Sequence, residues 1–322
     1  YRMTFRLRHF KTNKILSLAP INEESKDNNN IKAQGILKGE GANENKKFKF
    51  VLLDNDIEKC KKKIEKSIVS LSDNKIKYSL FKLLENTQDM PYSYNSYGYL
   101  DDLERITIDD LNNYYNSMIK DDIIDVYVVG DVNDDNIKKI FKEKFKNGTF
   151  HKYNYDIIAP ELTKVKKIDQ NSEKQDVNQT QLSILCSLHD LTDNERKYIL
   201  PVYGEMLGGS ANSILFDDVR EKNSYAYYVN AIVKSYDNIM MIYSGIENGN
   251  NDNVRKLIEK SLKNITKGNF DVDKLESAKK TMVSAIKASL DNPIGIINNY
   301  YAKELVNSPD IQERINNVLS VT

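Results

Sequence analysis

The side chains that most often carry metal or acid–base chemistry are scarce in this sequence. Its three histidines, His9, His151 and His189, lie far apart, and none belongs to a His-x-x-Glu-His or His-Glu-x-x-His motif or pairs with a nearby cysteine. The first two fall in polar stretches, and His189 directly precedes Asp190, where turn hydrogen bonds explain it. The sequence therefore predicts no zinc site built by this chain alone.

Other enzyme signatures are also missing. The sequence contains no Gly-x-Ser-x-Gly nucleophile motif, no phosphate-binding loop and no dinucleotide fingerprint. The glycine pattern from Gly204 to Gly209 lacks the lysine that a phosphate-binding loop needs. The usual enzyme signatures are therefore absent from this sequence.

The most informative stretch runs from Leu207 to Val229 and reads LGGSANSILFDDVREKNSYAYYV. Its two glycines end one expected helix, and Ser210 can cap the next, which ends near Arg220. Tyr227 then enters a strand. A guanidinium and a phenol can hold a peptide carbonyl or stabilise its oxyanion. Taken alone, the two residues are better explained as a partner of the helix dipole and a packing residue.

The order of features in this stretch resembles the second-domain motif of the insulinase, pitrilysin and mitochondrial-processing-peptidase family of inverzincins. There, a Gly-x-Ser helix, a Leu-Phe pair, an Arg-Glu-Lys turn and a Tyr-containing strand follow one another. In that family two halves close as a clamshell, and an Arg and a Tyr from one half contact substrate at a zinc site on the other. The resemblance implies that Arg220 and Tyr227 are substrate-binding residues.

The resemblance to bacterial family members without zinc ligands covers most of the chain. It includes several shorter segments: Phe10 to Asn13, Ala19 to Glu24, Asn74-Lys75 with Tyr78, Pro91 to Tyr94 with Gly98, Leu103 to Thr107, and Asp125 to Asp131. Where active members carry His-x-x-Glu-His, this chain reads NIKAQGILKG (Asn30 to Gly39), with no ligand and no general base. A central piece of the first domain is expected to be absent or replaced, and Val321-Thr322 is expected to precede a last helix and strand.

The pattern of apolar residues predicts the elements that position this motif. Apolar residues repeat every three or four positions from Ile57 to Leu71, as on one face of a helix. Residues 123–129 form a β-branched run typical of a strand buried on both faces. Further expected elements are a strand pair in Thr4 to Leu16, helices at 31–37, 76–84, 107 onward, 137–145, 195–207, 213–219, 254–265 and 272–290, and strands at 181–188, 227–233 and 239–243.

Strands interleaved with paired helices predict an α+β fold. We expect two related domains, each a mainly antiparallel sheet covered by helices on one face, as in one clamshell half of a processing-peptidase-like protein. The segment from His151 to Lys167 contains Pro160 and few helix formers, which suits a linker. The predicted domains are residues 1–158, without a zinc motif and expected to be incomplete, and residues 159–322, with the Arg/Tyr motif.

Bulk properties restrict the partners and the compartment. Lys+Arg and Asp+Glu both number 47, so a formal net charge of zero offers no attraction to nucleic acid or to an anionic membrane. No apolar run reaches the roughly 18 residues that a membrane helix needs. Cys60 and Cys186 lie in apolar patterns and are expected to be buried and unpaired, which fits a reducing compartment. We expect a cytoplasmic protein, or a mitochondrial matrix protein if the source is eukaryotic.

The resemblance implies a non-catalytic, substrate-binding subunit of a heterodimeric zinc metallopeptidase that acts on peptides or unfolded segments. Such a chain is inactive alone and holds no cofactor, and a homologous subunit bearing His-x-x-Glu-His supplies the zinc. A homodimer is an alternative arrangement. The alternative function is a structural or assembly module of the same fold, as in the zinc-less core proteins of a respiratory complex. A third option resembles the paired bacterial proteins linked to modification of a translation elongation factor.

Overall fold

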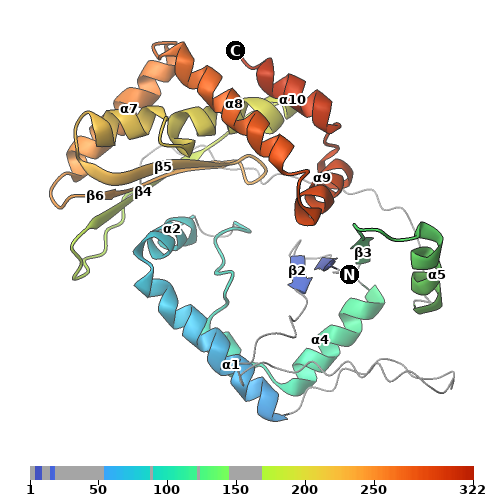
Figure 1. Cartoon of the computed structure of the whole chain (residues 1–322). Coiled ribbons are helices and arrows are strands. Elements are labelled where there is room, and N and C mark those ends of the chain that lie inside the picture. The colour runs from blue at the N-terminus through green and yellow to red at the C-terminus, as the bar shows by residue number, and fades with distance from the viewer. Residues whose placement is uncertain (1–3, 9–14, 19–53, 88–89, 122–123, 145–168) are drawn as a thin grey trace. The chain divides into compact units, whose positions relative to one another are not determined.

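The computed structural model describes residues 4–8, 15–18, 54–87, 90–121, 124–144 and 169–322 (Figure 1). Internal contacts divide the chain into unit 1, residues 1–70 and 96–130, and unit 2, residues 71–95 and 131–322. The predicted domain boundary at 158/159 lies outside the described residues and stays a prediction. So do the predictions for Phe10 to Asn13, Ala19 to Glu24 and the helix at 31–37, and the surroundings of His9 and His151.

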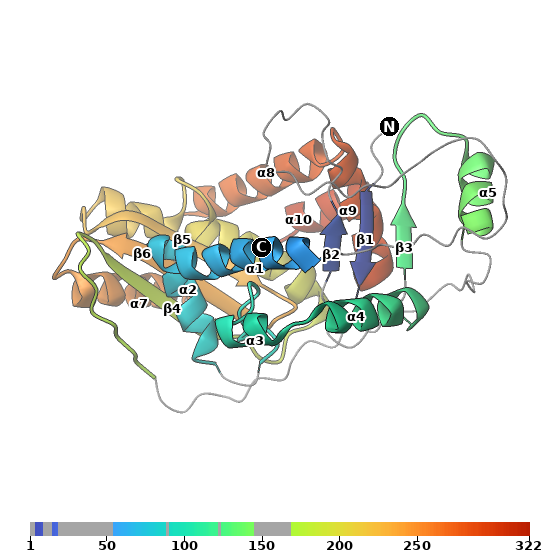
Figure 2. The same cartoon turned by 90° about the horizontal axis from the view of Figure 1, so that it is seen from below.

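Unit 1 contains a three-stranded antiparallel sheet (Figure 2). Its strands are β1 (Thr4–Arg8), β2 (Ile15–Leu18) and β3 (Ile124–Tyr127), in the order β2-β1-β3. The predicted strand pair is confirmed, with Phe5 opposite Leu18 in β2 and opposite Val126 in β3. The prediction that the strand at 123–129 is buried on both faces is wrong, because β3 is an edge strand of the described sheet and its described side chains are only half-buried.

Unit 1 also contains helices among its described residues. They are α1 (Asp54–Val69), α3 (Leu100–Arg105) and α4 (Ile108–Asp121). Before α4, the Asp110 carboxylate accepts hydrogen bonds from the backbone N–H of Thr107 at 2.8 Å and from its hydroxyl at 2.7 Å, as the Thr-x-x-Asp spacing predicts. Helices α1 and α3 contact each other, and Lys61 Nζ donates to the Glu104 carbonyl at 3.1 Å.

Unit 2 is built on the antiparallel sheet β4-β6-β5, with β4 (Thr180–Ser187), β5 (Ala226–Lys234) and β6 (Ile239–Ile246). Between β4 and β5 one continuous helical segment comprises η2 (Glu195–Ile199), α6 (Leu200–Gly204) and η3 (Glu205–Gly209), and the short helix η4 (Phe216–Glu221) follows. Gly208 lets η3 approach β5 closely, since a Cβ there would lie 2.8 Å from the Ala231 Cβ. The predicted strands and helices of this region are confirmed.

The remaining helices of the described residues also belong to unit 2. They are α2 (Lys75–Glu85), α5 (Asp134–Lys144), α7 (Asn251–Thr266), α8 (Val272–Ala288), α9 (Pro293–Val306) and α10 (Ile311–Leu319), and the short helix η1 (Ser70–Asp73) precedes α2 across the division between the units. The sequence interpretation did not identify α9 and α10.

The main core lies between the sheet of unit 2 and the helices η3, η4 and α7. It contains alternate β6 residues, Met240, Ile242 and Ile246, with fully buried side chains from η3, η4 and α7. Helix α2 contacts β4 and β6 (Figure 1), and the hydroxyls of Ser79 and Ser183 hydrogen-bond at 2.6 Å. Since Ser183 alternates with the core residues of β4, α2 lies on the opposite face of this sheet. The fold is α+β with antiparallel sheets, as predicted.

Candidate functional site at the start of strand β5

Arg220 lies in the last turn of η4, and its side chain is 45% exposed. The guanidinium stacks over the ring of Phe216, one turn earlier, with Cζ 4.6 Å from the ring centroid. Among the described residues its ion-pair partner is Glu221, whose carboxylate lies 3.9 Å from Nε. The ring of Phe216 therefore supports the guanidinium, and the ion-pair contact with Glu221 is at Nε.

A tight connection links Arg220 to strand β5. Ser224 adopts a left-handed backbone conformation with φ of 54° and donates its N–H to the Arg220 carbonyl at 2.9 Å. The next N–H, from Tyr225, donates to the Val219 carbonyl at 3.1 Å. These bonds satisfy carbonyls at the end of η4 and fix the direction in which the chain enters the strand.

Tyr227 is the extra residue of a β-bulge. Ala226 pairs with Ile246 in β6, but the next pair along the strand is Tyr228 with Gly245, which leaves Tyr227 without a partner. Ala226 and Val229 both reach the core on the helical side, so two consecutive tyrosines between them are excluded from it. The side chain of Tyr227 is 62% exposed. The bulge thus turns a phenol outward immediately after the Arg220 turn.

The second tyrosine of the bulge is also anchored, and the sequence interpretation missed it. The Tyr228 hydroxyl donates a hydrogen bond to Gln181 Oε1, and its ring lies 6.2 Å from that of Tyr243. Burial, followed by the nearby Tyr243, raises the pKa of Tyr228 to about 12. This phenol stays protonated, and thus a hydrogen-bond donor, at physiological pH. The signal in the sequence was the pair of adjacent tyrosines between two apolar residues, which breaks the strand alternation.

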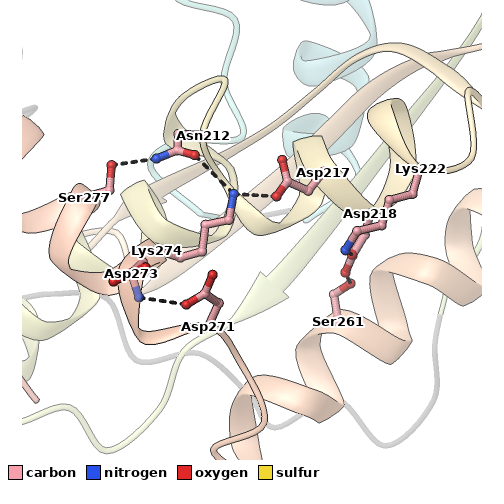
Figure 3. A network of polar contacts seen from close by, with 9 residues as sticks. All are labelled: Asn212, Asp217, Asp218, Lys222, Ser261, Asp271, Asp273, Lys274 and Ser277. Atoms are coloured by element: carbon pink, nitrogen blue, oxygen red, sulfur yellow. Dashed lines mark hydrogen bonds and ion pairs between the residues drawn. The ribbon is translucent and has the colours of Figure 1, made fainter.

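The side of η4 that faces α7 and α8 carries a polar network (Figure 3). Asp217 pairs with Lys274 of α8, and Lys274 also donates to Asn212 at 3.2 Å. Asp218 accepts from Ser261 of α7 at 2.7 Å and pairs with Lys222 at 2.8 Å. A cavity of about 270 Å³ beside these residues is also lined by Asn264, Asn269, Phe270 and Asp271. These contacts anchor η4 on the side that faces α7 and α8.

The side chains of the described residues do not fit a zinc ion. Within the described ranges, no group of three or more His, Cys, Asp or Glu is placed so that it could hold a metal. The segment Asn30 to Gly39 contains no imidazole, thiol or carboxylate. We therefore assign no metal-dependent hydrolytic step to residues of this chain.

The antiparallel sheets and their helices place the chain in the α+β class, and the exposed Arg220 and Tyr227 lie on consecutive elements. The chain belongs to the peptidase M16 family, since residues 105–282 match the family described as "Peptidase M16 inactive domain". The "Probable inactive metalloprotease YmfF" of Bacillus subtilis (strain 168) is 28% identical over 270 residues, which cover 81% of this chain and 62% of YmfF. The chain thus spans about three fifths of that relative.

Solved structures show the same fold. A conserved protein from Enterococcus faecalis V583 superimposes with a TM-score of 0.70 at 24% identity, over 82% of this chain and 63% of that one. A protease from Helicobacter pylori gives a TM-score of 0.65 at 15% identity, over 85% and 67% of the two chains. In the part of the chain that the structure describes, no helix has both the length and the apolar character to cross a membrane.

Proposed function

We propose that this chain is the non-catalytic, substrate-binding subunit of a heterodimeric zinc metallopeptidase. A homologous subunit bearing His-x-x-Glu-His would supply the zinc, and this chain would contribute Arg220 and Tyr227 to a bound peptide or unfolded segment. The observation that carries the proposal is the exposed guanidinium, which is oriented by Phe216 and has only a distant carboxylate partner among the described residues. The similarity to a protein named as an inactive metalloprotease supports a non-catalytic function.

The chemistry of the two side chains suits a peptide backbone. A guanidinium donates two parallel hydrogen bonds to one carbonyl or carboxylate, and a phenol adds a third donor. An extended peptide presents carbonyl groups in regular succession, and a carbonyl becomes an oxyanion during hydrolysis. Arg220 and Tyr227 can therefore hold the substrate and stabilise charge without supplying a nucleophile or a metal.

The proposed compartment is the cytoplasm. Cys60 and Cys186 are both free thiols, and they lie in different units of the chain. Burial raises the pKa of Cys186, which makes it a packing residue and not a reactive thiolate. Two unpaired cysteines are typical of a reducing environment.

The test is chelator-sensitive cleavage of unstructured peptides by the complex that the full chain recovers from its native lysate. Arg220→Ala should leave the complex assembled but lower kcat/KM about 100-fold, because one charged donor to the developing oxyanion is lost. Arg220→Lys should recover only part of this, since an ammonium cannot make the bidentate contact.

Lys280→Ala, which removes an exposed cation from α8, is the matched control and should leave turnover unchanged. Unchanged turnover in the Arg220→Ala complex would refute substrate contact by Arg220. If no complex of this chain cleaves peptides, the protein is a structural or assembly module of the M16 fold.

A further inference from the structure

The side chain of Tyr228 reaches across a whole strand. Tyr228 is in β5 and its hydrogen-bond partner Gln181 is in β4, but the strand order is β4-β6-β5, so β6 lies between them. The residue of β6 opposite Tyr228 is Gly245. A Cβ built on that glycine would lie 2.8 Å from Tyr228 Cζ, which is closer than real Cβ contacts allow. The ring of Tyr228 therefore lies over the backbone of Gly245, and only glycine leaves space for it.

The backbone of Tyr228 is fixed as well. The Ser244 side chain lies on the other face of β6, and its hydroxyl donates a hydrogen bond to the Tyr228 carbonyl at 2.7 Å. Tyr228 is thus held by its side chain toward β4 and by its carbonyl toward β6. The residue directly before it is Tyr227, which has no pairing partner of its own. An unpaired bulge residue takes its direction from the paired residues on either side of it.

We propose that Gln181, Tyr228 and Gly245, here called the Tyr228 bridge, form a positioning unit that fixes the bulge and so aims the Tyr227 phenol. The three residues come from the three strands of the sheet, so the bridge fixes the direction of Tyr227 relative to all of them. The consequence for ligand binding rests on the proposed function of Tyr227, but the geometric claim does not. The residues of the bridge are positioning residues, and Tyr227 is the one that would touch the peptide.

The test uses the full chain labelled with ¹³Cζ-tyrosine, with the Tyr227 resonance assigned from its absence in Tyr227→Phe. Tyr228→Phe and Gln181→Met each remove the bridging hydrogen bond without adding bulk, in contrast to Gly245→Ala. Both should shift the Tyr227 resonance. Both should also weaken binding of fluorescein-labelled casein, an unfolded protein, about 5-fold. This is the effect expected if the misaligned Tyr227 phenol loses one hydrogen bond to the ligand.

Two variants separate positioning from general damage. Gln181→Glu keeps an acceptor oxygen at the same reach, so the Tyr227 resonance and the affinity for casein should both stay at their wild-type values. Tyr243→Phe removes a hydroxyl whose ring lies 6.2 Å from that of Tyr228, and should change neither. An unshifted Tyr227 resonance in both Tyr228→Phe and Gln181→Met would overturn the proposal, whatever happens to the affinity.

The remaining outcomes distinguish this inference from the proposed function. A shifted Tyr227 resonance upholds the Tyr228 bridge even if the affinity for casein does not change or the wild-type chain binds no casein. In either of those two cases, Tyr227 is not the contact we propose. If the Tyr227 resonance shifts in Gln181→Glu as far as it does in Gln181→Met, the hydrogen bond is not what aims Tyr227, and the bridge is refuted.

Discussion

The two sides of helix η4 differ in how completely their charges are paired. On the side facing α7 and α8, Asp217 pairs with Lys274, and Asp218 is bound by Ser261 and Lys222 (Figure 3). On the other side Arg220 is 45% exposed and has a single carboxylate at 3.9 Å among the described residues. Both sides belong to one short helix, so composition alone does not account for the difference.

This contrast indicates that the two sides of η4 have different roles, although they are only a few residues apart in the sequence. Leu215 and Val219 are fully buried in the core, and the two aspartates connect the helix to two others. A helix anchored in this way loses little further freedom when a ligand binds to its outer side, which lowers the entropic cost of binding. In the proposed function, the paired side maintains the fold, and the weakly paired Arg220 guanidinium on the other side is the group that binds the ligand.

The largest effect that the contrast predicts is on stability, from the buried side. Leu215 is 0% exposed and directly precedes η4. Leu215→Ala should lower the free energy of unfolding by about 3 kcal/mol, from lost burial and the cavity left behind. Urea denaturation followed by circular dichroism measures this.

Leu319→Ala is the matched control, because Leu319 ends helix α10 and is 49% exposed. The same truncation there should cost less than about 1 kcal/mol, since little apolar surface returns to water. Equal costs at the two positions would mean that η4 is not anchored through the core.

The next effect concerns the polar anchor and depends on pH. Burial acts to raise the pKa of Asp218, but hydrogen bonds from Lys222 and Ser261 outweigh it and hold the pKa below the ordinary value of 3.8. A carboxyl with a lowered pKa stabilises the fold at any pH above its unfolded-state value. Asp218→Asn should therefore cost about 1 kcal/mol near neutral pH, a modest value because Lys222 is two-thirds exposed.

The sign of the pH effect is fixed by the direction of that shift. The stability difference between wild type and Asp218→Asn should stay constant from neutral pH down to about pH 4, then shrink as the pH falls through the folded-state pKa. Denaturation midpoints measured down to about pH 2 test this. A difference that grows on acidification would contradict the lowered pKa. Ser261→Ala should show a smaller version of the same profile, because it leaves Lys222 in place.

Much of the fold was predictable because its signals are local. The Thr107 cap, the end of the helical segment at Gly208 and Gly209, and the strands around them follow from neighbouring residues. Helix α9 was missed although Asn292 caps it, accepting from the Gly295 N–H at 2.7 Å. Its apolar residues do not gather on one face, and Ile294 and Tyr300 are mainly exposed, so the helical periodicity is weak.

The candidate site was only partly predictable, for a different reason. Arg220 and Tyr227 were found through a motif of consecutive residues. Whether they act as proposed stays a prediction. The bulge and the hydrogen bond between Tyr228 and Gln181 depend on strand register, because they join residues 47 positions apart across an intervening strand. Register is set by the pairing of whole strands, and no local pattern reveals which glycine will lie beneath which tyrosine.

The smallest effect on stability should come from the weakly paired side of η4, which carries Arg220. Arg220→Ala removes an exposed side chain whose contacts are the Phe216 ring at 4.6 Å and a carboxylate at 3.9 Å, so the free energy of unfolding should change by no more than about 0.5 kcal/mol. The same urea titration measures it beside Leu215→Ala. If Arg220→Ala instead costs more than about 1 kcal/mol, the guanidinium is itself an anchor and the contrast between the two sides fails. A loss of peptide turnover in that variant could then follow from a loosened helix. Unchanged stability is what allows a loss of turnover to be attributed to a missing ligand contact.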